Sequence, residues 1–276
     1  FDGETPVFDK DGNMTQMSIG GENTTLTYDS QNRLIQAGNN VYTYDAEDYR
    51  IKTVLDEEYE PNSRASTGVK VITSEYCYDR QNKNLLVRYN SDGTMEKYIY
   101  GNGLIAAECV TEEKTTEYKI YHYDIRGSVT SITNIDGTVT ARYSYSTYGT
   151  RTTINGSESE IVGYCGREGV ITDPNELIYM RSRYYSPELK RFINEDIVTG
   201  DISNSNSLNR YTYVEGNPIM MIDPFGLCAE RTEESRKNIA TALRQMSQVI
   251  DRHILTSYAF GNVSLAANLV ADVLDE

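Results

Sequence analysis

The chain has 276 residues, a hydrophobic content of 38% and a formal net charge of −15. This length allows one or two domains with a buried core. The acidic balance argues against a nucleic-acid backbone as the main partner. Phosphate binding needs clustered lysine and arginine, and these occur only in short stretches such as 181–183 and 190–191. No apolar run reaches the roughly 18 residues that span a bilayer, so stable membrane insertion is not expected.

The chain starts at Phe1 rather than methionine, which indicates a fragment or a processed piece. No signal peptide is visible, so export would depend on sequence outside these residues. Segment 9–13 resembles half of a calcium loop but lacks the later bidentate glutamate, and we interpret it as a turn. The four cysteines have no CxxC spacing, and only two histidines could join them: Cys77, Cys109, Cys165, Cys228, His122 and His253. Zinc, a disulfide framework and a cofactor are therefore not expected.

Residues 1–160 repeat one short unit, in which an alternating aromatic or β-branched run leads to Tyr-Asp and then to a polar turn. Alternation with period two predicts a half-buried strand, and an aspartate at its end can accept backbone N–H groups and begin the turn. Residues 128–143, centred on Asp136-Gly137, are typical of a complete hairpin. The pairs are Tyr28-Asp29, Tyr44-Asp45, Tyr78-Asp79 and Tyr123-Asp124. The sequence therefore predicts a mainly β fold of consecutive antiparallel hairpins.

These units resemble the YD repeats of the RHS family, bacterial rearrangement-hotspot proteins whose repeats also occur in teneurins and insecticidal toxin complexes. In that family the repeats wind into a large hollow β-shell. The present chain has too few units to close such a shell, so the resemblance implies a partial shell, namely its last turns. A generic antiparallel sheet that happens to use tyrosine is the alternative interpretation.

Residues 161–227 resemble the RHS-associated core, because several spaced elements occur in the expected order. These elements are Gly166-Arg167, Arg183-Tyr184-Tyr185-Ser186-Pro187, Arg191-Phe192-Ile193 and Asn209-Arg210-Tyr211-Thr212-Tyr213. The segment ends in Pro218-x4-Asp223-Pro224-Phe225-Gly226-Leu227, which matches the signature that closes the core. In bacterial members the core cuts the chain just after the leucine and releases a variable toxin. The resemblance therefore implies autoproteolysis between Leu227 and Cys228.

Peptide hydrolysis by carboxylates needs two of them sharing one proton, and Asp223 is the first candidate. The family places the second soon after the Arg-Phe-Ile strand, where this chain has Asp196. Many members have proline after that aspartate, but this chain has Ile197, which leaves Asp201 and Glu195 as rivals.

The turn residues of the motif have a structural reading of their own. Pro224 and Gly226 would fix a sharp turn that presents the scissile bond, although Asp-Pro-x-Gly is also an ordinary turn sequence. Attack by the Cys228 thiol is disfavoured because neither histidine is near it in sequence.

Residues 228–276 change to a composition that favours helix. Apolar residues at Ile239, Leu243, Met246, Val249, Ile250 and Leu255 form one helical stripe. Thr232 can cap its start, Gly261-Asn262 ends it, and 263–274 predict a second short helix. We interpret this short α-helical C-terminal segment as a linker or as the start of the variable toxin region, with the effector beyond Glu276.

Two functions of different classes are consistent with the sequence. The first is the C-terminal part of an RHS polymorphic toxin, a β-shell that encloses a toxin and releases it after Leu227. Its own C-terminal segment would be its cargo, and an immunity protein and secretion machinery would be further partners. The resemblance implies a secreted or cell-surface protein. The second is a non-catalytic YD-repeat module for adhesion or carbohydrate binding, since exposed tyrosine faces suit sugar stacking. A scaffold without activity is a third interpretation.

Overall fold

The computed structural model describes residues 6–19, 22–57, 70–81, 83–156, 160–197, 208–227 and 230–231. Three predictions lie outside the described residues: Asp201 as a rival acid, Cys228 at the proposed cut, and the helices beyond residue 231. The two described residues after the gap at 228–229 form a short strand, Glu230–Arg231. The change to helix expected from Cys228 onward therefore does not occur at these two positions.

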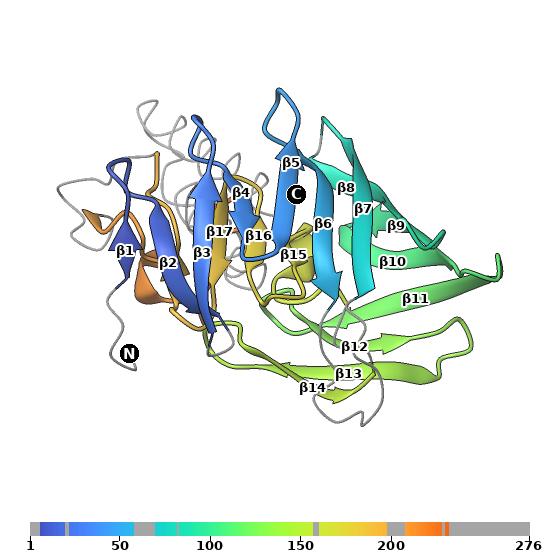
Figure 1. The fold of residues 1–276 in the computed structure, drawn as a ribbon. Helices are drawn as coiled ribbons and strands as arrows, with labels where there is room; N and C mark the ends of the chain where they lie inside the picture. Colours follow the sequence, from blue (N-terminus) through green and yellow to red (C-terminus); the bar gives the residue numbers. More distant parts are fainter. Residues whose placement is uncertain are drawn as a thin grey trace, which may run out of the picture.

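Fourteen strands form one antiparallel sheet in which each strand pairs with the next in sequence (Figure 1). The strands are β1 (Val7–Phe8), β2 (Met14–Ile19), β3 (Glu22–Tyr28), β4 (Leu34–Ala37), β5 (Asn40–Tyr44), β6 (Arg50–Glu57), β7 (Lys70–Asp79), β8 (Asn84–Asn90), β9 (Met95–Gly101), β10 (Gly103–Val110), β11 (Thr116–Tyr123), β12 (Val129–Thr133), β13 (Val139–Tyr145) and β14 (Arg151–Asn155). The prediction of consecutive antiparallel hairpins is confirmed, including the β12–β13 hairpin around Gly137. We call this long sheet the wall.

The Tyr-Asp units make their turns through the aspartate carboxylate. Asp29 accepts the backbone N–H groups of Gln31 and Arg33 at 2.9 and 3.0 Å. Asp124 accepts the N–H groups two and four positions further on, both at 2.9 Å, and Asp45 repeats the pattern. Each carboxylate thereby satisfies two turn donors, so an aspartate ends each strand of this kind.

The tyrosines of these units pack on the inner side of the turn rather than facing solvent. The four tyrosines that precede aspartate are partly buried against the main core. The hydroxyls of Tyr44 and Tyr123 donate to the carbonyl oxygens of Leu34 and Leu104, each at 2.7 Å. Tyrosine therefore fills the core with its ring and satisfies a backbone acceptor with its hydroxyl, which phenylalanine could not do.

The segment after the wall, residues 160–197 and 208–227, folds as small sheets and turns, and we call it the core segment. One sheet contains β15 (Ile171–Thr172), β16 (Ile178–Met180), β17 (Arg183–Ser186) and β18 (Arg191–Phe192), and β19 (Met221–Ile222) pairs with β20 (Glu230–Arg231). Single 3-10 turns occur at η1 (Gly166–Glu168) and η3 (Val214–Gly216). Figure 1 shows β15–β17 lying inside the curve of the wall.

The core segment and the wall share one hydrophobic core. Leu26 and Tyr42 of the wall and Leu177 and Tyr184 of the core segment belong to the same buried cluster. A second cluster lies within the core segment and includes Tyr213. The strands of the core segment have two to four residues each and are buried at nearly every position. Such short strands bury little surface on their own, so most of their stability comes from packing against the wall.

A buried ion pair also joins the two parts. Arg50 at the start of β6 places Nη1 2.6 Å from Oδ2 of Asp173 and 2.7 Å from the hydroxyl of Tyr184. The side chains of Arg50 and Asp173 are 0% and 1% exposed. Four tyrosine rings surround the guanidinium, the nearest being that of Tyr179, whose centroid is 4.4 Å from Cζ. An arginine fully removed from water is thus compensated by one carboxylate and several aromatic faces.

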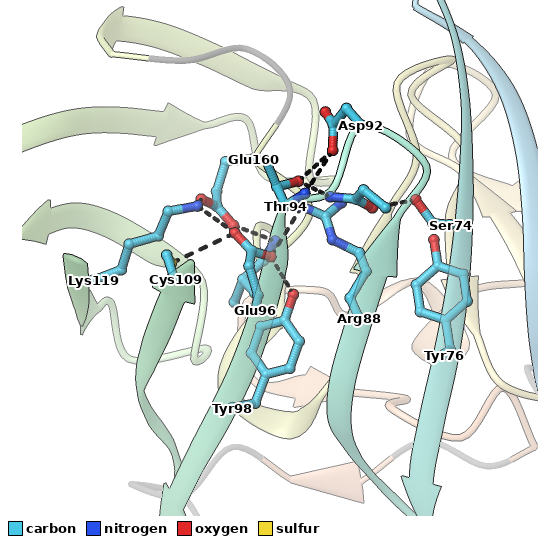
Figure 2. Close-up of polar contacts among 12 residues, drawn as sticks. Ser74, Tyr76, Arg88, Asp92, Thr94, Glu96, Tyr98, Cys109, Lys119 and Glu160 are labelled. Carbon is cyan, nitrogen blue, oxygen red and sulfur yellow. Dashed lines mark hydrogen bonds and ion pairs between the residues drawn. The ribbon is translucent and has the colours of Figure 1, made fainter. Parts of the chain in front are cut away.

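A second polar cluster forms where β8, β9 and β11 meet the start of the core segment (Figure 2). Glu96 contacts Arg88 at 2.9 Å and Lys119 at 2.7 Å, and it accepts the Tyr98 hydroxyl at 2.6 Å. Lys119 also contacts Glu160 at 2.7 Å. Glu160 opens the core segment, so Lys119 ties that segment to the wall by a mostly buried pair of contacts.

This cluster predicts a loss of stability in acid. Burial raises the pKa of Glu96, but Arg88 and Lys119 outweigh it and hold that pKa well below the usual range. A carboxyl whose pKa is lower in the folded chain than in the unfolded chain stabilises the fold at pH values above its unfolded-state pKa of about 4.3. This stability is lost as the pH falls towards the folded-state pKa. We expect Glu96→Gln to lower the free energy of unfolding at pH 7, and the gap to wild type to narrow between about pH 5 and pH 2. Urea denaturation across this range measures both effects.

The matched control is Glu113→Gln, at an exposed turn residue. It should follow the wild-type acid profile. A Glu96→Gln profile parallel to wild type at every pH would show that Glu96 does not contribute to the acid sensitivity.

Candidate functional site

The closing motif is held by the tip of the β16–β17 hairpin. The backbone N–H of Ser182 donates to the carbonyl oxygen of Phe225 at 3.2 Å. Arg183, just after the tip, donates from Nε to the carbonyl oxygen of Gly226 at 2.5 Å. Because Met180 and Arg183 pair across this hairpin, the tip is a tight turn with little freedom to move away from the motif. Two elements noted separately in the sequence, Arg-Ser-Arg-Tyr-Tyr and Asp-Pro-Phe-Gly-Leu, are therefore partners in space.

Arg183 brings Asp196 and Asp223 to one guanidinium nitrogen. Its Nη2 lies 2.7 Å from Oδ2 of Asp196 and 3.4 Å from Oδ2 of Asp223. These two distances limit the separation of the two oxygens to about 6 Å. The arginine is itself fixed, since its Cζ lies 3.6 Å from the ring centroid of Phe192 and its Nη1 donates to the carbonyl of Arg210 at 3.0 Å. The structure thus places the two predicted acids at one site.

The two acids share a cation at this site. Burial lowers the pKa of Arg183, while Asp196 and Asp223 raise it. Their Oδ2 atoms both contact the Nη2 of Arg183. The sharing of one proton between the two acids stays a prediction.

The rival acid Glu195 points elsewhere. Its Oε2 lies 2.6 Å from Nη1 of Arg210, and both side chains are about one-third exposed. A Cβ on Gly12 would lie 2.8 Å from the Glu195 side chain, which places that carboxylate against the first turn of the wall. Asp196, one position later, is fixed by its backbone N–H, which donates to the carbonyl of Arg210 at 3.0 Å. The geometry therefore distinguishes the two adjacent acids by the direction each side chain takes.

Asp223 also contacts the backbone next to the proposed cut. Its Oδ1 accepts the N–H of Leu227 at 3.1 Å, one residue before the bond between Leu227 and Cys228. Pro218, Pro224 and Gly226 are buried, and Leu227 is half-buried. The motif is thus a docked turn in which the aspartate holds the last described residue before the proposed cut.

Gly226 is the position at which this turn tolerates a side chain least. Its φ is +66°, and an added Cβ would lie 2.7 Å from the carbonyl oxygen of Met180 and 3.0 Å from the N of Arg183. We expect Gly226→Ala to lower the free energy of unfolding by about 2–5 kcal/mol, from backbone strain plus displacement of the hairpin tip. Gly93→Ala is the control, since Gly93 has φ +88° and nothing within 4 Å, and it should cost only about 1–2 kcal/mol. Equal losses in urea denaturation would contradict the close packing of the motif on the tip.

Neither Arg181 nor Arg183 was predicted from the sequence as a site residue. Both lie in the basic stretch 181–183, and Arg183 also begins the Arg-Tyr-Tyr-Ser-Pro element of the core. An arginine on either side of a hairpin tip is an available signal, but its partners lie about 40 positions later. Nothing local in the sequence indicates that pairing. Among the described residues there is no group of three or more histidine, cysteine, aspartate and glutamate side chains arranged for a metal ion. No helix within the described ranges is long and apolar enough to cross a membrane.

Comparison with known proteins agrees with this fold. The teneurin YD-shell family matches residues 5–136. The tRNA(Glu)-specific nuclease WapA of Bacillus subtilis subsp. natto is 28% identical over 215 residues, which cover 73% of this chain and 9% of that protein. The tRNA nuclease WapA of Bacillus subtilis strain 168 is 25% identical over 238 residues, or 82% of this chain and 10% of that protein. The chain is thus related to YD-repeat shell proteins such as WapA. The resemblance to RHS and YD-repeat proteins drawn from the Tyr-Asp units is thereby confirmed.

Solved structures show the same shell fold. The complex TcdB2-TccC3 aligns with a TM-score of 0.61 and 18% identity, covering 80% of this chain and 11% of that one. The complex TcdB2-TccC3-Cdc42 aligns with a TM-score of 0.59 and 19% identity over the same share of both chains. At this identity the likeness concerns the fold. This YD-shell chain spans about a tenth of the length of the proteins it matches.

Proposed function

We propose that the chain is the closing part of the β-shell of a polymorphic toxin precursor, and that its core segment cuts the precursor after Leu227. The observation that carries the proposal is the convergence of Asp196 and Asp223 on Arg183, beside the N–H of Leu227. A turn sequence alone needs neither a second acid nor an arginine. Support for the toxin context comes from the WapA relatives, whose names describe nucleases and which are about ten times longer than the matched region.

The two acids take different roles in the proposed reaction. Asp223 holds the Leu227 N–H and so fixes the last residue before the cut. The Asp196 side chain is 15% exposed, against 3% for Asp223, and is therefore the better placed to meet water. Asp196 takes a proton from a water molecule while the water oxygen adds to the Leu227 carbonyl carbon. The proton then passes to the departing nitrogen of Cys228, so that hydrolysis consumes one water and leaves a carboxylic acid and an amine, which ionise to a carboxylate and an ammonium.

Arg183 supports this chemistry by position. Its Nη2 holds Asp196 and Asp223 at one site. Its Nε donates to the carbonyl of Gly226, one peptide unit before the reacting carbonyl of Leu227, and so helps to fix the backbone there. The bond to be cut belongs to the same chain as the acids, so one turnover per chain is sufficient. The fold itself positions the bond, and no separate substrate has to bind.

The resemblance supplies the remaining parts of the proposal. The segment after Leu227 would be the cargo enclosed by the shell, and an immunity protein would protect the producing cell. Secretion machinery would deliver the precursor to the cell surface or beyond it.

The test is a time course of the full-length precursor made by cell-free translation and followed by intact mass. We expect wild type to be cut, and Asp223→Asn and Asp196→Asn each to slow cutting by at least about 100-fold, as for loss of a general base or a fixed orientation. The control is Asp136→Asn, at an exposed hairpin turn, which should cut at the wild-type rate. Cutting of both aspartate variants at the wild-type rate would refute the proposal.

The adhesion or carbohydrate-binding alternative was suggested by the teneurin resemblance and by tyrosine faces that, if exposed, would suit sugar stacking. Among the described residues, only Tyr89 and Tyr118 are tyrosines with exposed side chains. Most other described tyrosines pack in the core or against it, and Tyr49, Tyr148 and Tyr211 are half-buried. The observation that favoured this alternative is therefore weaker in the folded chain than in the sequence.

A further inference from the structure

Arg181, at the tip of the β16–β17 hairpin, joins three separate segments by donating hydrogen bonds to three carbonyl oxygens. Its Nη1 lies 2.6 Å from the carbonyl oxygen of Pro224 in the closing motif. Its Nη2 lies 2.8 Å from that of Glu168 in the core segment. Its Nε and Nη2 lie 3.4 and 3.3 Å from that of Lys83, in the turn between β7 and β8 of the wall. One side chain thus ties the motif to the wall.

Phe225 completes the contact. Its ring centroid lies 4.7 Å from Cζ of Arg181 and 5.4 Å from Nζ of Lys83, so the ring lies within reach of two cations from two different parts of the fold. Cation–π contacts of this kind favour a flat aromatic ring over an aliphatic side chain of similar size. Phe225 is the variable position of Asp-Pro-x-Gly-Leu, and the structure gives it a specific partner set.

The contact between Arg181 and the closing motif requires a strained backbone conformation and a space left free by a glycine. Arg181 has φ +59°, a left-handed conformation that disfavours most side chains. The guanidinium of Arg181 occupies space that is free because residue 169 is glycine. A Cβ on Gly169 would lie 2.8 Å from Nη2 of Arg181. Arg181 is half-buried, its guanidinium donates to carbonyl oxygens, and burial lowers its pKa. A surface arginine would need none of these features, and a turn stabilised for its own sake would use glycine or asparagine here.

We infer that Arg181 and Phe225 are positioning residues that fasten the cleavage turn to the wall, so that cutting after Leu227 requires the shell as well as the core segment. This inference rests on the proposed cleavage. Neither residue touches the reacting atoms. Each acts by holding the backbone of Pro224 and Phe225 in place. The adjacent residues Gly226 and Leu227 are thereby kept next to Asp196.

The test uses the full-length precursor in the same cell-free time course. Arg181→Gly removes the side chain and keeps the left-handed turn, so the hairpin itself is retained. Phe225→Leu removes the aromatic face, and Phe225→Tyr retains it. Arg80→Gly is the control for loss of an arginine from the same region of the wall, because the Arg80 side chain is 60% exposed and its ion pairs are with Asp45 and Glu47, outside the closing motif.

We expect Arg181→Gly and Phe225→Leu each to slow cutting by about 10- to 100-fold, the usual effect of misplacing a reacting group. The double variant should be little slower than the slower single variant, because both changes break the same contact. Phe225→Tyr and Arg80→Gly should cut at close to the wild-type rate. Cutting of Arg181→Gly and Phe225→Leu at the wild-type rate would overturn the inference. It would also be overturned if the fold-losses in rate of the two single variants multiplied in the double variant, or if Phe225→Tyr cut as slowly as Phe225→Leu.

A second measurement separates this inference from the proposed cleavage. Amide hydrogen exchange is measured at Gly226 and Leu227 in an uncut precursor carrying Asp196→Asn. Addition of Arg181→Gly should speed exchange at these two amides by at least tenfold, and addition of Arg80→Gly should leave it unchanged. Unchanged exchange with Arg181→Gly would overturn the inference even if cleavage is observed. Faster exchange in a precursor whose wild type is never cut would support the clamp and refute the cleavage.

Discussion

Replacing Arg50 with leucine is expected to lower the free energy of unfolding by about 3–5 kcal/mol, the usual cost of leaving a buried charge without its partner. Asp173 would remain 1% exposed, without the ion pair that compensates it. Burial raises the pKa of the Asp173 carboxyl, and Arg50 opposes that rise. The variant carboxyl should therefore take up a proton more readily, so the deficit should shrink as pH is lowered. Urea denaturation at pH 7 and pH 5 measures the loss and its direction.

The double variant Arg50→Leu/Asp173→Leu is the matched test of this explanation. Removing both charges leaves no orphaned group, so the double variant should be more stable than Arg50→Leu alone by roughly 2 kcal/mol or more. If the double variant is as unstable as Arg50→Leu, the loss comes from the packing of the arginine among its four tyrosine rings rather than from the uncompensated buried charge of Asp173. That result would contradict the role of the ion pair in joining the wall to the core segment.

The second large effect is expected at Arg183. In Arg183→Leu the carboxylates of Asp196 and Asp223 would be close together with no cation between them. Like charges in a buried site repel, and protonation relieves the repulsion. We expect a loss of about 3–5 kcal/mol at pH 7 that is smaller near pH 4. The precursor carrying this variant should also fail to cut after Leu227, because Asp196 and Asp223 lose the side chain that holds them at one site.

Arg183→Leu combined with Asp196→Asn separates the two effects. The double variant removes one of the two negative charges and should regain part of the stability at pH 7, while cutting stays absent. A single variant that unfolds equally readily at pH 7 and pH 4 would show that charge repulsion is not the cause. In that case the loss would come from the arginine's stacking on Phe192 and its hydrogen bonds to backbone carbonyls.

Most of the wall could be predicted from sequence because its information is local. An alternating run, a Tyr-Asp pair and a polar turn lie within about ten residues, and the aspartate closes its turn with donors two and four positions away. Neighbouring strands in sequence are also neighbours in the sheet, so no long-range pairing had to be inferred.

The placement of the core segment against the wall could not be predicted in the same way. Arg50 and Asp173 are 123 residues apart, and neither residue type nor spacing marks them as partners. The pairing of Asp196 with Asp223 came from the family resemblance and not from periodicity. Arg183 was missed because its role depends on two acids brought together by tertiary contacts. The predicted helices beyond residue 231 stay a prediction.

The position of the cut is the most direct test of the central claim. Intact mass of the full-length wild-type precursor should show two products, one ending at Leu227 and one beginning at Cys228, and the Asp223→Asn precursor should show a single uncut mass. A single uncut wild-type chain, or products from a bond elsewhere that also form in Asp223→Asn, would contradict the claim that Arg183, Asp196 and Asp223 form a cleavage site.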